Sequence, residues 1–214
     1  MRWTVVIPVK ALPAAKSRLA PASADPDAHR RLVEAIRADT MAAAAGAPSV
    51  ARILLVTDAG QAGPDTVVQT RPGLNGALRD AAEHAARHWP GDGIAALVGD
   101  LPSLRSAELD DALGQAALAG GGFVADADGT GTTLLAAVPG RALEPRFGPG
   151  SASRHAEIVG ALPAGAGLRR DVDTAEDLRR AAAGPGVGPR THAVLHDTGD
   201  HPARRSPCLG MMPS

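Results

Sequence analysis

Short apolar runs alternate with segments of helical periodicity along almost the whole chain. The first run, residues 4–9 (TVVIPV), is rich in β-branched residues, and the helical segment 27–45 after it places Leu32, Ile36 and Thr40 on one face. Further strands are predicted at 51–56, 66–69, 93–98, 123–125, 133–138 and 168–172, and further helices at 75–89, 106–119, 174–183 and directly after Ser151. Strands that alternate with helices of this length are typical of an α/β fold. The sequence therefore predicts a three-layer α/β/α domain with a mostly parallel central sheet.

Composition sets the domain boundaries that we expect. At 214 residues the chain is long for one domain and short for two. From Gly184 onward it becomes rich in Gly, Pro, His and Arg, although residues 191–195 are still expected to dock as a last turn. We therefore expect one domain over residues 1–196 and a disordered C-terminal tail over 197–214.

Composition also excludes several classes of function. The single cysteine, Cys208, permits neither a disulfide framework nor a cysteine-based zinc site within the chain, so we expect a reducing, cytoplasmic setting. The 22 basic and 23 acidic residues give a formal net charge of −1, which offers no general reason to expect nucleic acid as a partner. No stretch is long and apolar enough to predict a membrane span.

Three cations follow the first predicted strand directly: Lys10, Lys16 and Arg18. The carboxyl end of a strand is where open α/β sheets bind their ligands. Residues 10–18 contain no glycine, so ammonium and guanidinium groups, rather than backbone N–H groups, would meet an anion there. A solvated basic surface loop is the alternative reading of the same residues.

Two carboxylates are expected at strand ends. Asp100 ends the predicted strand 93–98 and Asp171 lies within the predicted strand 168–172, just before the helix that Asp173 or Thr174 would cap. If both face one cleft, they are suited to hold Mg²⁺, which combines few carboxylates with water and substrate phosphates. Asp173 is the alternative second ligand, and a turn-forming role is the alternative for Asp100.

Small residues form two further clusters, GTGTT at 129–133 and RFGPGS at 146–151. Glycines let backbone N–H groups approach a ligand closely, and Ser151 begins a predicted helix, whose N-terminus attracts anions. The two segments predict either an anion-binding site for a small acid or a pair of tight turns. Asn75 follows Pro-Gly-Leu, and it either caps the helix or turns its amide to the base or ribose of a nucleotide.

In this order the motifs resemble the phosphoenolpyruvate / 2-phospho-L-lactate guanylyltransferase family of coenzyme F420 biosynthesis. The resemblance covers residues 4 to 195 and rests on Val-Lys10-x5-Lys16-Ser-Arg18-Leu, Gly73-Leu-Asn75-x-Ala-Leu, Gly99-Asp100-Leu-Pro102, Gly129-Thr-Gly-Thr132, Arg146-Phe-Gly148-Pro-x-Ser151 and Asp171-Val-Asp173-Thr. Gly-Asp-Leu-Pro is shared widely among nucleotidyltransferases, whereas the Arg-Phe-Gly-Pro-x-Ser element is far more selective. The loop before Arg146 is long for the family, and the residues beyond Leu195 find no match.

The resemblance implies a nucleotidyltransferase fold and a reaction in which a phosphorylated three-carbon acid attacks the α-phosphate of GTP. It implies that Thr132, Gly148 and Ser151 bind the acid and that Asp100 and Asp171 hold Mg²⁺. Lys10, Lys16 and Arg18 would neutralise the triphosphate as catalytic and nucleotide-binding residues, with Asn75 a further nucleotide contact. A direct hand-off of the product to the next enzyme of the pathway is a further expectation.

These motifs constrain the identity of the acid less than they constrain the family. The Ala/Arg/Gly-rich character of the chain resembles the bacterial branch of the family, for which phosphoenolpyruvate is implied, and 2-phospho-L-lactate is the alternative. A different nucleotidyltransferase of this fold, acting on a sugar phosphate or a molybdopterin, would normally carry a Gly-Gly-x-Ser-x-Arg-Met loop, which is absent here. A non-catalytic nucleotide-binding module is the remaining alternative.

Overall fold

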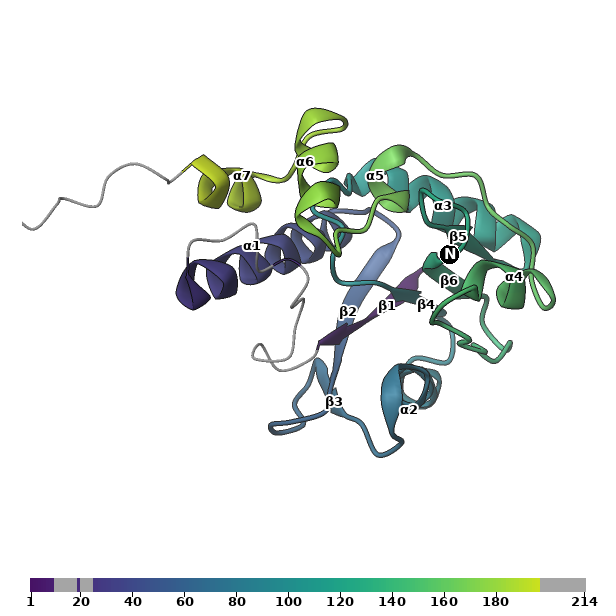
Figure 1. Ribbon diagram of the computed structural model, residues 1–214. Helices are drawn as coiled ribbons and strands as arrows, with labels where there is room; N and C mark the ends of the chain where they lie inside the picture. Colours follow the sequence, from purple (N-terminus) through teal and green to yellow (C-terminus); the bar gives the residue numbers. More distant parts are fainter. Residues whose placement is uncertain (10–18, 20–24, 197–214) are drawn as a thin grey trace, which may run out of the picture.

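A six-stranded mixed sheet forms the centre of the protein, whose computed structural model describes residues 1–9, 19 and 25–196 (Figure 1). The strands are β1 (Trp3–Val9), β2 (Val50–Thr57), β3 (Thr66–Val68), β4 (Gly93–Leu97), β5 (Gly121–Ala125) and β6 (Thr132–Ala137), in the order β3-β2-β1-β4-β6-β5. The pairs β3–β2, β2–β1 and β1–β4 are parallel, whereas β6 runs antiparallel to both β4 and β5. The predicted mostly parallel sheet is therefore confirmed, with an antiparallel hairpin added at one edge.

Helices cover both faces of this sheet. They are α1 (Pro26–Ala45), α2 (Gly73–His88), α3 (Ser106–Ala119), α4 (Ser151–Ala156), α5 (Ala166–Arg169), α6 (Ala175–Ala183) and α7 (Pro189–His196). On one face, Leu109 and Leu113 of α3 share a core cluster with Val5 of β1, and α1 packs beside them. On the other face, Leu78 of α2 packs with Val6 of β1, and α4 belongs to the same cluster (Figure 1). Because alternate β1 residues enter opposite clusters, the predicted three layers are confirmed.

The segment after α5 corrects one predicted strand. Residues 168–172 begin inside helix α5 and continue without strand pairing. Leu168 and Val172 are both fully buried, four residues apart, but they enter different core clusters. The backbone makes one cross-segment hydrogen bond here, from Val172 N to Asp100 O at 3.0 Å, instead of a ladder. The apolar residues were read correctly as buried, and their assignment to a strand was wrong.

The start of helix α2 also differs from the prediction. Helix α2 begins at Gly73 with Pro72 as the N-cap residue, so Asn75 lies inside the helix and does not cap it. Helix α3 has Arg105 at the N-cap position, and Ser106 donates its hydroxyl to Ala43 O at 2.8 Å, which ties α3 to α1. No helix in the described part of the chain has the length and apolar character needed to cross a membrane.

Candidate active site

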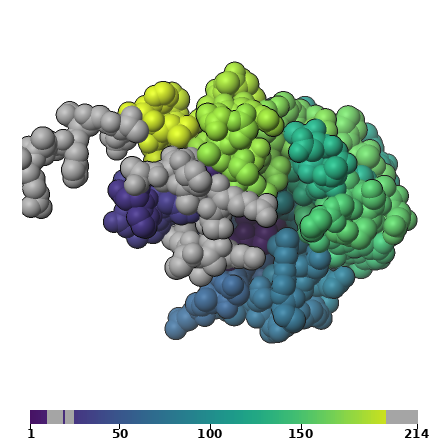
Figure 2. Space-filling view, in the orientation of Figure 1, coloured from purple at the N-terminus to yellow at the C-terminus, as the bar shows by residue number. Residues whose placement is uncertain are grey.

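A hollow opens at the carboxyl end of β1, where the sequence predicts ligand binding. Figure 2 shows it in space-filling form: its floor is the purple of β1, and its borders are the blue of the 50–80 region, the green of the segment leading into α4 and the yellow-green of α6. Parallel β1 and β4 end at this edge of the sheet, which is the usual ligand position in such folds. The predicted cations Lys10, Lys16 and Arg18 lie outside the described residues.

Hydrogen bonds to three other segments hold the loop that carries Asp100. Leu101 N donates to the Thr40 hydroxyl of α1 at 2.9 Å, and Asp100 O accepts the hydrogen bond from Val172 N. Pro102 O accepts a further hydrogen bond, at 2.7 Å, from Gly188 N just before α7. Since three separate segments fix the backbone of this short loop, the half-buried Asp100 carboxyl group has a well-defined place at the end of β4.

Asp171 precedes Val172, so the same backbone hydrogen bond brings the two predicted metal ligands onto neighbouring segments. Asp171 and Asp173 line a cavity of about 320 Å³. The other charged residues around this cavity are Asp126, Asp128, Asp177, Arg170 and Arg180, and Asp100 is not among its lining residues. Asp177 already accepts hydrogen bonds from the backbone N–H and the hydroxyl of Thr174, the predicted N-cap of α6. Asp171 and Asp173 therefore line the same cavity as this capping group.

The donor chemistry around Asp100 and Asp171 fits Mg²⁺ in one specific way. Within the described ranges, no group of three or more His, Cys, Asp or Glu side chains could hold a metal ion. An all-protein cage therefore does not form there. Mg²⁺ normally binds through one or two carboxylates, and waters and substrate phosphates complete its octahedron. The carboxylate oxygens of Asp100 and Asp171 suit that second arrangement, in which the nucleotide brings part of the coordination shell.

Arg37 is a charged residue near Asp100 that the sequence analysis did not single out. It lies on α1, one turn before Thr40, and is half-buried. Burial lowers the pKa of its guanidinium group, and the carboxylates of Glu34 and Asp100 oppose that effect. Arg37 and Thr40 are three residues apart on α1 and share one helical face, and only the folded chain shows that this face meets the Asp100 loop.

The three predicted acid-binding residues come together on one side of the sheet. Ser151 begins α4 and its N–H donates to Gly148 O at 3.0 Å, while Ala152 N donates to Thr130 O at 3.1 Å. Gly148 has a φ of +118°, which favours glycine and leaves its backbone exposed. The side chains of Thr132 and Ser151 are buried, with 6% and 2% of each residue exposed. Two adjacent turns thus place two buried hydroxyl groups beside an open glycine backbone.

His155 connects these turns and was also missed by the sequence analysis. Its Nδ1 lies 2.8 Å from Thr132 Oγ1, and its Nε2 accepts a hydrogen bond from Arg146 N at 2.9 Å. The ring is fully buried, and its centroid lies 5.9 Å from that of Phe123 and 5.1 Å from that of Phe147. Burial, together with the cations Arg154 and Arg146, lowers the pKa of His155 to about 4. The ring is therefore neutral near pH 7.

Asn75 holds the next residue of the same loop, Phe147. Its Oδ1 accepts a hydrogen bond from Phe147 N at 2.7 Å, and its Nδ2 donates to Phe147 O at 3.1 Å. This bidentate contact joins α2 to the residue directly before Gly148. One amide hydrogen of Nδ2 is not used by these two bonds.

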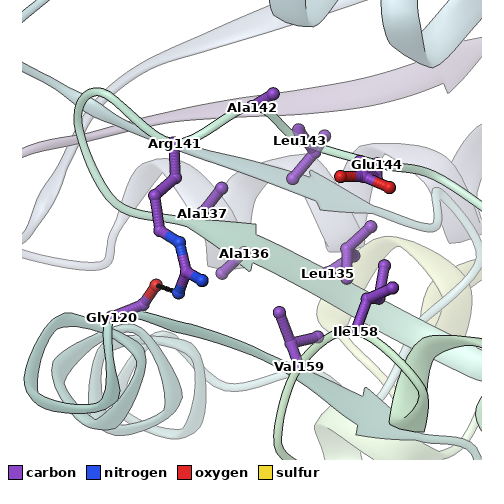
Figure 3. A pocket seen from close by; sticks show the side chains of 10 residues that line it. All are labelled: Gly120, Leu135, Ala136, Ala137, Arg141, Ala142, Leu143, Glu144, Ile158 and Val159. Carbon is purple, nitrogen blue, oxygen red and sulfur yellow. Dashed lines mark hydrogen bonds between the residues drawn. The ribbon is translucent and has the colours of Figure 1, made fainter.

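A second cavity, of about 150 Å³, lies against β6 and contains none of the predicted site residues (Figure 3). Leu135, Ala136 and Ala137 of β6 form one wall, and Ile158 and Val159 form another. Arg141 reaches across it and donates to Gly120 O at 2.8 Å. This mostly aliphatic lining offers few groups for phosphate or metal chemistry, so the candidate site remains at the ends of β1 and β4.

Two solved structures share this fold. A candidate nucleotide-diphospho-sugar transferase from Desulfovibrio desulfuricans G20 superposes with a TM-score of 0.70, covering 92% of this chain and 95% of the other, at 17% identity. A 4-diphosphocytidyl-2C-methyl-D-erythritol synthase superposes with a TM-score of 0.51, covering 85% of this chain and 97% of the other, at 13% identity. The chain belongs to the CofC-like guanylyl transferase family, which it matches over residues 3–164.

Curated relatives extend the match to most of the chain. A phosphoenolpyruvate guanylyltransferase from Geodermatophilus obscurus is 50% identical over 208 residues, covering 90% of this chain and 94% of the relative. A protein of the same name from Streptomyces scabiei is 46% identical, covering 91% of this chain and 96% of the relative. The family predicted from the sequence motifs is thereby confirmed.

Proposed function

We propose that the protein transfers GMP from GTP to phosphoenolpyruvate in coenzyme F420 biosynthesis. The observation that carries this function is the 44–50% identity, over about 90% of the chain, to relatives named phosphoenolpyruvate guanylyltransferase. In the reaction, a phosphate oxygen of phosphoenolpyruvate forms a bond to the α-phosphorus of GTP. The bond from that phosphorus to the bridging oxygen of the β-phosphate breaks, and pyrophosphate leaves with the electron pair. The other product is enolpyruvoyl-2-diphospho-5′-guanosine.

The acceptor is already an anion, so the chain needs to bind and orient it rather than remove a proton from it. In our proposal the hydroxyl groups of Thr132 and Ser151 and the backbone at Gly148 bind the acid, chiefly its carboxylate. The burial of the two hydroxyl groups supports this role, because hydrogen bonds to a charged group strengthen where water is excluded. Asn75 holds the loop before Gly148 and is kept as a nucleotide contact through its remaining amide hydrogen.

The triphosphate would lie between the cations Lys10, Lys16 and Arg18 and the carboxylates Asp100 and Asp171. In our proposal the three cations neutralise the charge that moves onto pyrophosphate. Asp100 and Asp171 would hold Mg²⁺, with Asp173 the alternative to Asp171. When bound, Mg²⁺ supplies charge neutralisation on the phosphates. A cytoplasmic location and direct hand-off of the product to the next enzyme remain predictions.

A pyrophosphate-release assay tests the reaction. GTP, ATP and CTP are each combined with phosphoenolpyruvate, 2-phospho-L-lactate and 3-phosphoglycerate in the presence of Mg²⁺. We expect the highest kcat/KM for GTP with phosphoenolpyruvate. A higher kcat/KM with 2-phospho-L-lactate would change the assigned acceptor substrate, and the protein would still be a guanylyltransferase. Nucleotide binding with no pyrophosphate release for any pair would favour the non-catalytic module instead.

A further inference from the structure

The environment of His155 fixes which of its two ring nitrogens carries a hydrogen. A backbone N–H can only donate, so the Arg146 N–H at 2.9 Å requires a lone pair on Nε2. A neutral imidazole has one N–H, which must then be on Nδ1. The low pKa described above supports the neutral form, since a doubly protonated ring would place an N–H against the N–H of Arg146.

This tautomer determines the direction of the next hydrogen bond. Nδ1–H donates to Thr132 Oγ1 at 2.8 Å, so the hydroxyl oxygen accepts there. The hydrogen of the same hydroxyl group cannot point at the ring and is left to donate to another acceptor. An anionic ligand needs hydrogen-bond donors rather than acceptors. Because Thr132 is buried, a hydrogen bond from its hydroxyl group to an anion is strengthened.

We propose that His155 is a positioning residue that makes the Thr132 hydroxyl a hydrogen-bond donor to an anionic oxygen of the three-carbon acid. This role rests on the proposed function, because Thr132 is placed in the acid site by that function. His155 does not touch the acid itself. It acts through Thr132 and also links α4, the Arg146 backbone and β6. One buried ring therefore sets both the position of the Thr132 hydroxyl group and the direction in which that group donates its hydrogen bond.

Two substitutions of the ring separate its two contacts. In His155→Gln the side-chain amide can reach the place of Nε2 and accept from Arg146 N–H, but it leaves Thr132 without its partner. In His155→Asn the amide nitrogen replaces Nδ1 and can still donate to Thr132. We expect His155→Gln to raise the KM for phosphoenolpyruvate by about tenfold, in line with the loss of one charge-assisted hydrogen bond, with little change in the KM for GTP. His155→Asn should have a clearly smaller effect.

A double-mutant cycle with Thr132→Val tests whether His155 acts through Thr132. If it does, adding His155→Gln to Thr132→Val raises the KM for phosphoenolpyruvate no further. If the two substitutions instead multiply and raise the KM for phosphoenolpyruvate about a hundredfold in the double variant, the inference is overturned. An equal effect of His155→Gln on the KM for GTP would also overturn it. Wild-type protein that releases no pyrophosphate from GTP and phosphoenolpyruvate would instead overturn the proposed function.

Nuclear magnetic resonance of the wild-type full chain covers the case in which a His155 variant fails to fold. The ¹⁵N chemical shifts of an imidazole distinguish the Nδ1–H and Nε2–H tautomers directly. We expect His155 to be neutral and protonated on Nδ1 at pH 7. A neutral ring protonated on Nε2, or a charged ring, would overturn the inference without any measurement of activity.

Discussion

Ser151 differs from its neighbour Ser153 in burial, and this difference makes the pair a matched test of the acid site. Ser151 is 2% exposed at the start of α4, whereas Ser153 is exposed on the same helix. We expect Ser151→Ala to raise the KM for phosphoenolpyruvate by about tenfold and the KM for GTP much less, because one donor to the charged acid is lost. Steady-state kinetics with each substrate varied in turn measures both values. Ser153→Ala should behave as wild type, and equal effects of Ser151→Ala on both KM values would place Ser151 outside the acid site.

Asp100 and Asp171 allow a similar test of the metal site. We expect Asp100→Asn and Asp171→Asn each to lower Mg²⁺-dependent kcat by about two orders of magnitude or more, since a metal ion contributes several kcal/mol to charge stabilisation. The unfolding temperature should stay close to that of the wild type. Asp128→Asn is the control, because Asp128 lines the same cavity as Asp171 but is exposed and has no predicted metal role. Near-normal pyrophosphate release by either of the first two variants would refute the two-carboxylate site.

The contacts that the sequence analysis missed share a property. Asn75 and Phe147 are 72 positions apart, and Thr132 and His155 are 23 apart, yet both pairs meet through short hydrogen bonds. Each of these polar residues finds its partner on a different element, so only the folded chain reveals the pairing. The grouping of Thr132, Gly148 and Ser151 could be predicted because their motifs stand close together in the sequence and resemble a known family.

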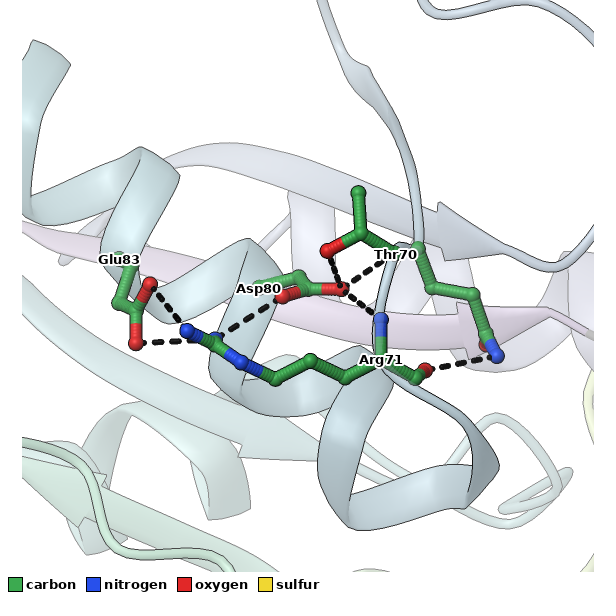
Figure 4. Close-up of polar contacts among 5 residues, drawn as sticks. Thr70, Arg71, Asp80 and Glu83 are labelled. Carbon is green, nitrogen blue, oxygen red and sulfur yellow. Dashed lines mark hydrogen bonds and ion pairs between the residues drawn. The ribbon is translucent and has the colours of Figure 1, made fainter.

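At the scale of elements, Asp80 shows how one half-buried carboxylate holds the segment that leads into a helix. Asp80 of α2 accepts hydrogen bonds from the backbone N–H groups of Thr70 and Arg71 and from the Thr70 hydroxyl, and it pairs with the Arg71 guanidinium, which also contacts Glu83 (Figure 4). Burial acts to raise the pKa of Asp80, but these donors together lower it below its usual value. The segment that leads into α2, and with it Asn75, is held by this group.

The lowered pKa makes the contribution of Asp80 dependent on pH. A carboxyl group with a lower pKa in the folded state stabilises the protein at pH values above its unfolded pKa, and this stability is lost as the pH falls through the folded pKa. We expect Asp80→Asn to lower the free energy of unfolding by about 1–3 kcal/mol at pH 7. Denaturant titrations at pH 7 and at successively lower pH should show the difference from wild type shrinking below about pH 4. The exposed Asp111 of α3 provides the control variant Asp111→Asn, and a pH-independent difference would contradict the assignment.

The elements that could be predicted are those with a local signal. The run of β-branched residues in β1 and the cap of α6 are both contained within a few residues. The β1 strand is confirmed, and of the two predicted caps, Asp173 and Thr174, the structure has Thr174. The direction of β6 depends on which strand it pairs with, and no local pattern encodes that choice. The strand predicted at residues 168–172 was wrong for a related reason. Burial against the Asp100 loop gives the same apolar spacing as burial in a sheet.

At the scale of the whole molecule, the segment that ends in α7 contacts both α1 and the loop that carries Asp100. Asp39 of α1 is buried and accepts hydrogen bonds from the N–H groups of Arg190 and Thr191 at 3.2 and 2.7 Å, so α1 caps the start of α7. Gly188 N, just before this helix, donates to Pro102 O in the Asp100 loop. Gly188, 88 positions beyond Asp100 in the chain, thus helps to hold the loop of the predicted metal ligand in place.

Two truncations separate the part of the C-terminal segment that the fold uses from the part that we predict to be dispensable. A chain that ends at residue 196 keeps α7, and we expect its unfolding temperature and its kcat with GTP and phosphoenolpyruvate to match those of the full chain. A chain that ends at residue 184 leaves the buried Asp39 carboxylate without its two N–H donors, which costs about 3 kcal/mol and lowers the unfolding temperature by roughly 10 °C. Its kcat should also fall, because the Asp100 loop loses the hydrogen bond from Gly188. Calorimetry and the pyrophosphate-release assay on the same preparations measure both effects, and equal behaviour of the two truncated chains would show that α7 supports neither the fold nor the site.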